Sequence, residues 1–188
     1  MNTAKTDRRT RRTKALLLEG LMHLMETKDI KDISVKELSD LVDINRSTFY
    51  LHYNDIYDML EQIENELFLE FNAILDRTIC REFQPDSAQT TLFEIFSFLE
   101  RHRDVTKTII GPHGDLSFVN RMKNLVKERI HCLLNSNQPN GDYAYTEAFV
   151  VSGCVGVIET WLSHPAPKSP EDISAMCSTL LTKGSFIS

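Results

Sequence analysis

A short segment near residue 50, RSTFYLHY (residues 46–53), concentrates side chains that can form hydrogen bonds with a nucleic acid. Arg46 can present two parallel N–H donors to O6 and N7 of guanine. The other polar groups of the segment are the hydroxyls and imidazole of Ser47, Thr48, Tyr50, His52 and Tyr53. We expect the first three of these to meet bases or phosphates, and the last two, at the C-terminal end, to meet phosphates.

Two short helices are predicted to position this segment. Ser34 and Glu37 form a capping box, in which the hydroxyl accepts from the amide of residue 37 and the carboxylate reaches back to the amide of residue 34. A helix therefore begins at Ser34 and ends near residue 42. After a turn at Asp43, Asn45 is a strong N-cap for a second helix over about 45–52. This layout is that of a helix-turn-helix, whose second helix lies in the DNA major groove.

The charge distribution supports DNA as a partner. Residues 1–53 carry ten Lys+Arg and eight Asp+Glu, whereas the remainder carries eleven and nineteen. A basic N-terminal part on an acidic chain is typical of DNA-binding proteins. Lys36 and the amides at Ser34 are expected to contact phosphates. Residues 1–14 are predicted to be a disordered arm that becomes helical near Arg9, and its Arg11 and Arg12 either follow the DNA backbone and minor groove or belong to a solvated tail.

Apolar periodicity predicts helices along the whole chain. A first helix ends near Lys28, and a long helix runs from Ile56 to about Cys80. Further helices are expected at about 88–102, 104–110, 115–135, 142–163 and 170–184. The predicted fold is therefore all-α with about nine helices. Residues 1–53 form a three-helix DNA-binding domain with a basic N-terminal arm, and residues 54–188 form a helical bundle for effector binding and dimerisation.

A second copy of the chain is expected as a partner, because one helix-turn-helix reads too few base pairs and a dimer supplies two half-sites roughly 34–36 Å apart. Residues 143–162 are apolar nearly all round, which predicts that both faces are buried. We predict that this helix and the last one pair with their symmetry mates in a four-helix bundle. The interface candidates are Phe149, Ser152, Gly153, Gly156, Trp161, Ile173, Met176 and Leu180. The alternative is that these residues form only an intramolecular core.

An effector pocket is expected between the long fourth helix and its neighbours. Its candidate lining residues are apolar and come from several helices, namely Phe68, Phe71, Phe93, Phe96, Met122 and Phe149. Core packing is the alternative role for each of them. The sequence leaves open whether the effector is a small molecule or a protein.

Catalysis and cofactor binding lack support in the sequence. We find no P-loop, GxGxxG, HExxH or GxSxG motif, and the six His and four Cys show no metal-ligand spacing. The cysteines are expected to be buried, reduced thiols. No segment resembles a signal peptide or reaches the roughly 20 apolar residues that span a bilayer. We therefore expect a cytoplasmic protein that is not an enzyme and has no metal, cofactor or membrane partner.

The string VKELSDLVDINRSTFYLHYNDIYDML resembles the DNA-binding signature of TetR-type regulators. It shares with them a short helix, a turn and a Thr-Phe-Tyr-x-His-aromatic run that leads into a long helix. The resemblance implies that Phe49 is core, that Thr48, Tyr50 and His52 contact phosphates, and that Arg46, Ser47 and Tyr50 read bases. Two positions depart from the pattern. Asp43 replaces the usual turn glycine, and Ile56 replaces a lysine that would contact phosphate.

The C-terminal half is similar to TetR-type regulators of dihydroxyacetone kinase operons, through FLERHRDVTKTIIGPHGDLSFVNRMK and GVIETWL. This resemblance implies an all-helical core domain and does not identify an effector. Taken together, these observations predict a ligand-responsive repressor that binds a palindromic operator as a homodimer. The alternatives are a regulator or activator that a protein partner controls, and a helical interaction module without specific DNA binding.

Overall fold

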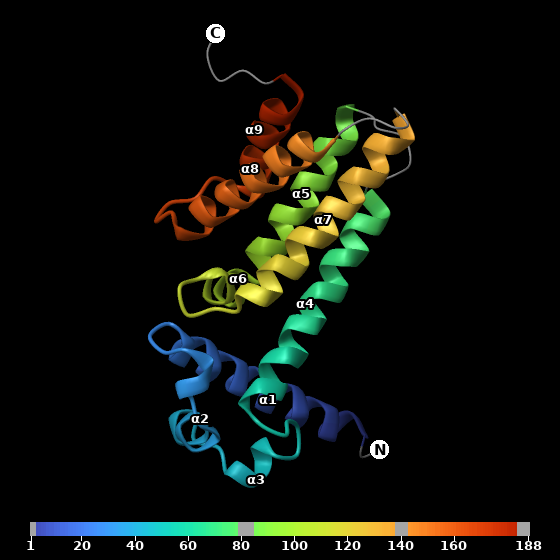
Figure 1. Ribbon diagram of the computed structural model, residues 1–188. Coiled ribbons are helices and arrows are strands. Elements are labelled where there is room, and N and C mark those ends of the chain that lie inside the picture. Colours follow the sequence, from blue (N-terminus) through green and yellow to red (C-terminus); the bar gives the residue numbers. More distant parts are fainter. Residues whose placement is uncertain (1–2, 79–84, 138–142, 184–188) are drawn as a thin grey trace. The chain divides into compact units, whose positions relative to one another are not determined.

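The computed structural model describes residues 3–78, 85–137 and 143–183. These ranges contain nine α-helices, one 3-10 turn and no strand, which confirms the all-α prediction (Figure 1). The chain divides into two compact units. Unit 1 comprises Met1–Asn65 and Thr108–Asp115, and unit 2 comprises Glu66–Lys107 and Leu116–Ser188. The functional division between residues 53 and 54 stays a prediction.

Unit 1 contains α1 (Thr3–Met25), the 3-10 turn Ile30–Asp32, α2 (Val35–Leu41), α3 (Arg46–Phe49) and the first turns of α4 (Ile56–Thr78). The prediction of a disordered arm up to Arg9 is wrong, because α1 is already helical from Thr3. The core of the unit is built from the apolar faces of these helices, with Leu17, Leu21, Met25, Leu38, Phe49 and Met59 at most 1% exposed. Apolar burial of this kind is the main stabilising contribution to such a small unit.

A glycine lets α1 and the end of α2 approach closely. A Cβ placed on Gly20 would lie 2.4 Å from Cγ1 of Val42 and 2.9 Å from Cδ1 of Leu38. Such distances are well inside ordinary van der Waals contact, so only glycine fits at this crossing without a shift of its neighbours. The close crossing fixes α2, and therefore the turn and α3 that follow it, against the longest helix of the unit.

Unit 2 contains the rest of α4 together with α5 (Pro85–Arg101), the first residues of α6 (Arg103–Ile110), α7 (Leu116–Asn137), α8 (Ala144–Ser163) and α9 (Pro170–Lys183). In this unit α9 packs along α5, and α8 packs on α7. The predicted bounds of the last five helices agree with the observed ones to within three residues. The predicted start of α5 at about residue 88 is late, because the chain is already helical at Pro85. The predicted end of α4 at Cys80 lies outside the described residues.

Aromatic and polar contacts join the helices of unit 2. The rings of Phe71 on α4 and Phe98 on α5 lie 5.8 Å apart. The guanidinium of Arg121 on α7 lies 4.0 Å from the ring centre of Phe68 on α4. Glu70 on α4 accepts a 2.6 Å hydrogen bond from Arg101 on α5. These contacts align α5 and α7 with α4, as Figure 1 shows.

Candidate nucleic-acid interface

The start of α2 forms half of the predicted capping box. The Ser34 hydroxyl accepts a hydrogen bond of 3.1 Å from the backbone amide of Glu37, as expected. The Glu37 carboxylate, however, pairs with the ammonium group of Lys28, which follows α1. A charged donor forms the stronger bond with a carboxylate, so this long-range pair replaces the local return bond to residue 34. The pair ties the end of α1 to the start of α2.

The turn between α2 and α3 has the predicted geometry. Asp43 has a φ of 52°, the left-handed conformation that its short polar side chain tolerates better than most residues. Asn45 then caps α3, because its Oδ1 accepts hydrogen bonds from the backbone amide of Ser47 at 2.9 Å and from the Ser47 hydroxyl at 3.0 Å. The Ser47 hydroxyl donates its proton within the cap, so towards a base it can act only as an acceptor.

Two buried aromatic residues decide which face of α3 points outward. Phe49 is fully buried and Tyr53 is 6% exposed, and their ring centres lie 5.6 Å apart. Residues four apart share a helix face, so the inward face of this segment is the 49/53 face. Arg46 and Tyr50, also four apart, both lie on the exposed side. Tyr50 is 58% exposed, and its ring makes an edge contact with Phe49 at 5.5 Å, which limits its rotation.

The remaining predicted contact residues differ in accessibility. Lys36 and Ser34 are exposed at the start of α2, and Arg11 and Arg12 are exposed on α1. Thr48 and His52 are half-buried, which leaves part of each side chain accessible. Tyr53 packs inside unit 1, and the ammonium group of Lys14 lies 5.3 Å from its ring centre. Tyr53 therefore has a mainly structural position. Buried Ile56, at 3% exposure, could not replace the missing lysine contact.

Sequence reasoning overlooked one exposed residue of this surface. Leu51 is 78% exposed and lies four residues after Ser47, on the outward side of the segment. Residues four apart share a helix face, so Leu51 lies on the same face as the exposed Ser47. Its apolar side chain has no hydrogen-bonding group, and for that reason it was not among the predicted contact residues.

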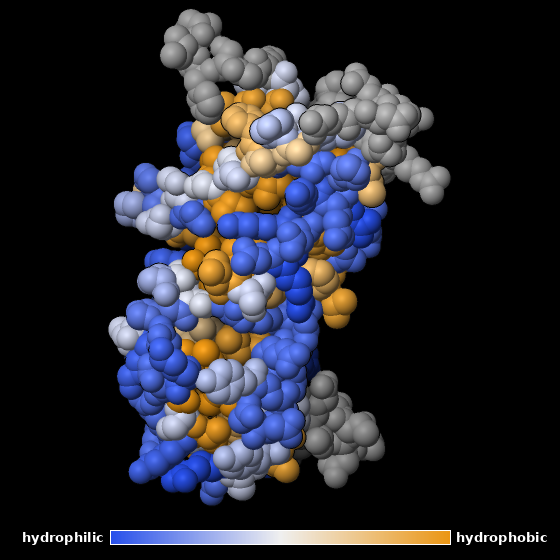
Figure 2. Space-filling view, in the orientation of Figure 1, coloured by the Kyte–Doolittle hydropathy of each residue, from blue (hydrophilic) through white to orange (hydrophobic). Residues whose placement is uncertain are grey.

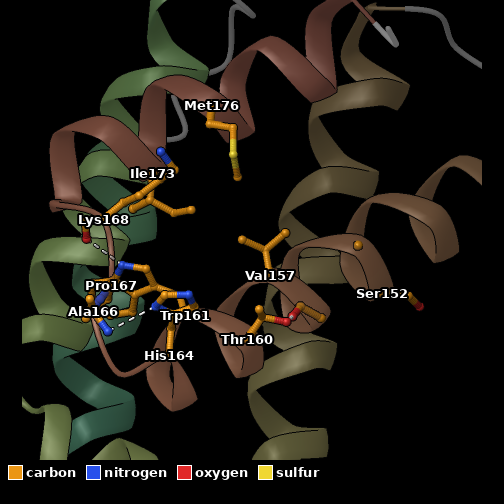
Figure 3. Close-up of a pocket in the computed structure, with 12 residues that line it drawn as sticks. Ser152, Val157, Thr160, Trp161, His164, Ala166, Pro167, Lys168, Ile173 and Met176 are labelled. Atoms are coloured by element: carbon orange, nitrogen blue, oxygen red, sulfur yellow. Dashed lines mark hydrogen bonds between the residues drawn. The ribbon is translucent and has the colours of Figure 1, made fainter. Parts of the chain in front are cut away.

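Unit 2 contains a pocket of about 670 Å³ between α8, α9 and their connecting loop. Figure 3 shows Val157 and Trp161 of α8 facing Ile173 and Met176 of α9 across it. Six of the eight predicted interface residues line this pocket, namely Ser152, Gly153, Gly156, Trp161, Ile173 and Met176. None of the six effector candidates belongs to its described lining. This pocket is thus an opening in the predicted dimer surface, separate from the predicted effector site.

The effector candidates have unlike surroundings. Phe71 and Phe96 are buried in the core of unit 2 at 6% and 1% exposure. Phe68, Phe93 and Met122 are half-buried, and Phe68 lies against Arg121. Phe149 is 72% exposed in the single chain, which fits its predicted interface role better than a place in a pocket. Core packing, the alternative weighed for these residues, therefore describes the positions of Phe71 and Phe96.

Trp161 forms the buried wall of the pocket and is 3% exposed. Its ring lies 5.3 Å from that of Phe96, and its Nε1 donates a 2.8 Å hydrogen bond to the carbonyl oxygen of Lys168. The Arg103 guanidinium stacks on the same ring at 4.6 Å and donates to the carbonyl oxygens of Trp161 and Leu162 at 3.0 and 3.2 Å. These contacts hold the C-terminal end of α8 in place. Trp161 is therefore an internal support of the predicted interface.

The family model described as "Transcriptional regulator C-terminal region", one of the TetR C-terminal models, matches residues 86–183, more than half of the chain. The chain belongs to the TetR family of transcriptional regulators. A comparison with curated proteins finds no match. The family assignment confirms the resemblance seen in residues 35–60, which lie outside the matched range.

Solved structures of TetR-family regulators share the fold over nearly the whole chain. SmeT, the repressor of the Stenotrophomonas maltophilia multidrug efflux pump SmeDEF, is 13% identical, with a TM-score of 0.69 over 93% of this chain and 91% of SmeT. FadR from Bacillus subtilis, solved in complex with stearoyl-CoA, is 14% identical, with a TM-score of 0.65 over 91% of this chain and 98% of FadR. DhaS, a dihydroxyacetone kinase operon activator, is 15% identical, with a TM-score of 0.54 over 92% of this chain and 95% of DhaS.

Members of the TetR family are transcriptional regulators. Among the described residues, no cluster of three or more His, Cys, Asp or Glu is arranged to hold a metal ion. Burial raises the pKa of the Cys177 thiol to about 11, and it raises the pKa of Cys154 as well. A thiol with a raised pKa is a weak nucleophile at neutral pH. In the described ranges no helix is long and apolar enough to cross a membrane.

Proposed function

We propose that this TetR-family regulator binds a palindromic operator sequence-specifically as a homodimer in the cytoplasm, and that an effector controls this binding. The observation that carries the proposal is the capped α3, which presents Arg46 and Tyr50 on one exposed face while Phe49 anchors the opposite face. In a helix-turn-helix such a face enters the major groove. Arg46 would read guanine, Tyr50 would contact bases and phosphate, and Thr48, His52, Lys36 and the Ser34 amides would contact phosphates.

Dimerisation through α8 and α9 is supported by surface that a single chain leaves uncovered. On α8, Tyr145 and Phe149 are 85% and 72% exposed. In the described part of the chain, a Cβ added to Gly153 or Gly156 would meet no atom within 4 Å, so intramolecular packing does not explain these glycines. Small residues allow a second helix to approach closely. Figure 2 shows orange apolar surface between polar areas over the helices of unit 2.

Effector control would act through α4, which begins in unit 1 and continues into unit 2. A ligand that prefers one position of α4 would change the separation of the two reading helices, and operator affinity would change by the difference in its binding free energy between the two states. We propose that the protein represses transcription rather than activates it. SmeT is a repressor, whereas DhaS is an activator, and FadR was solved with a ligand bound.

Operator binding is tested by titrating genomic DNA fragments against purified protein at about 50 and 200 mM salt, because phosphate contacts make affinity strongly salt-dependent. Arg46→Ala should weaken selective binding by about 1–3 kcal/mol per half-site, the contribution of one bidentate guanine contact, or roughly 5- to 150-fold. Tyr50→Ala should also lose selectivity. Arg101→Ala on α5 removes an exposed arginine from unit 2 and should bind like wild type.

The result that supports the proposal is tight binding to a small set of fragments by wild type and Arg101→Ala, with loss of this selectivity in both α3 variants. Weak, unselective binding that is unchanged by Arg46→Ala and Tyr50→Ala would contradict it. The α3 face would then serve structure alone, and a protein-interaction role would explain the exposed surface of unit 2 better.

A further inference from the structure

Leu51 is the most exposed leucine among the described residues, at 78%. A single exposed leucine is common on protein surfaces and needs no explanation by itself. The position of Leu51 is what distinguishes it. It follows directly on Tyr50, and it lies on the outward side of the segment whose inward side is held by Phe49 and Tyr53.

Two residues beside Leu51 on this surface are held by contacts within the segment. Tyr50 is held by its edge contact with Phe49, and the Ser47 hydroxyl is committed to the Asn45 cap. The outward surface of this segment therefore combines a cation from Arg46, a phenol from Tyr50 and an aliphatic group from Leu51. Only the first two have groups that can hydrogen-bond to DNA.

We infer that Leu51 packs against the 5-methyl group of a thymine in each operator half-site and thereby selects thymine over other bases at that position. This inference rests on the proposed function. In the major groove, thymine presents a methyl group beside its O4 acceptor, whereas the other three bases present hydrogen-bond donors or acceptors and no methyl group. A leucine placed on such polar edges would leave them without hydrogen bonds, which is costly. A methyl group is therefore the surface that Leu51 fits.

The expected effect is that of burying one methyl group against an apolar partner. Removal of one thymine methyl should weaken binding by about fourfold. This corresponds to about 0.8 kcal/mol, since about 1.4 kcal/mol changes Kd tenfold. The effect should occur at one thymine in each half-site, because the two protomers of a symmetric dimer make the same contacts. Simultaneous removal of both methyl groups should weaken binding by roughly fifteenfold.

The test uses the full-length protein and the operator obtained by fragment selection, in which each thymine is replaced in turn by deoxyuridine. Deoxyuridine keeps every hydrogen-bonding group of thymine and lacks only the methyl group. Wild type and Leu51→Ala are compared by titration. Leu69→Ala is the matched control, since Leu69 is 66% exposed on α4 in unit 2. Thermal unfolding of all three proteins checks that the fold is retained.

The inference is supported if one deoxyuridine per half-site lowers the operator affinity of wild type and of Leu69→Ala by about fourfold. Leu51→Ala should then bind the substituted and the unsubstituted operator equally well. It is overturned if no thymine is sensitive in wild type, or if Leu51→Ala keeps the same sensitivity as wild type. In both cases selective operator binding persists, so the proposed function stands. Unselective binding by wild type overturns the proposed function and this inference together.

Discussion

Replacing Arg103 with alanine should destabilise unit 2 more than replacing the neighbouring Arg101. The Arg103 guanidinium, 4.6 Å from the centre of the Trp161 ring, also donates to the carbonyl oxygens of Trp161 and Leu162 at the end of α8. The last carbonyls of a helix have no intrahelical donor, so Arg103 supplies hydrogen bonds that the helix itself cannot make. Its positive charge also lies at the negative end of the helix dipole.

The size of the effect follows from these contacts. A hydrogen bond to a charged group contributes about 1.5–3 kcal/mol, and a cation–π contact about 0.5–2 kcal/mol. Arg103 is 23% exposed and the two carbonyls share one nitrogen, so the sum is reduced by solvent and geometry. We expect Arg103→Ala to lower the free energy of unfolding by about 2–4 kcal/mol. Arg101 is 56% exposed and pairs with Glu70, so Arg101→Ala should cost only about 0–1 kcal/mol.

Urea unfolding measures the free energy of unfolding of both variants. The protomer concentration is kept fixed, because the stability of an oligomer depends on concentration. Trp161 is the single tryptophan of the chain, so its fluorescence reports directly on the end of α8. In Arg103→Ala the emission should also change under native conditions, because the cation is removed from the ring. Equal unfolding free energies for the two variants, with unchanged emission, would refute the role assigned to Arg103.

Three further predictions concern other contacts. Gly20→Ala should lower the free energy of unfolding by about 1–2 kcal/mol, because overpacking against Val42 outweighs the gain in helix propensity. A second substitution, Val42→Ala, should restore part of the lost stability. An unchanged urea midpoint in Gly20→Ala would contradict the close crossing of the two helices. The hydrogen bond from His113 holds the pKa of Asp29 below its usual 3.8. The stabilising contribution of Asp29 is therefore present above pH 3.8 and is lost as the pH falls through the lowered pKa. Urea midpoints measured from about pH 6 to 3 should vary less in Asp29→Asn than in wild type. We expect wild type to sediment as a dimer and Phe149→Asp to sediment as a monomer. A dimer that persists in Phe149→Asp would exclude Phe149 from the proposed interface.

Local sequence determined much of unit 1. Caps and turns depend on residues within a few positions of one another, so Ser34, Asp43 and Asn45 could be assigned without a tertiary structure. The resemblance to TetR-type regulators implied that Phe49 is core, and its burial confirms this. The helix bounds of unit 2 were predicted closely because Gly, Pro and polar clusters separate the helices.

Tertiary structure decided the contacts that join distant residues. Glu37 binds Lys28 rather than closing the capping box, because α1 brings a charged donor within reach. Arg103 and Trp161 meet across 58 positions of sequence, and no local pattern marks that pair. The sequence showed α8 to be apolar all round, but only the folded chain separates the side held by Arg103 from the side with exposed Phe149 and open glycines. Periodicity specifies a helix and its apolar faces, whereas the partner of each face depends on the packing of the whole unit.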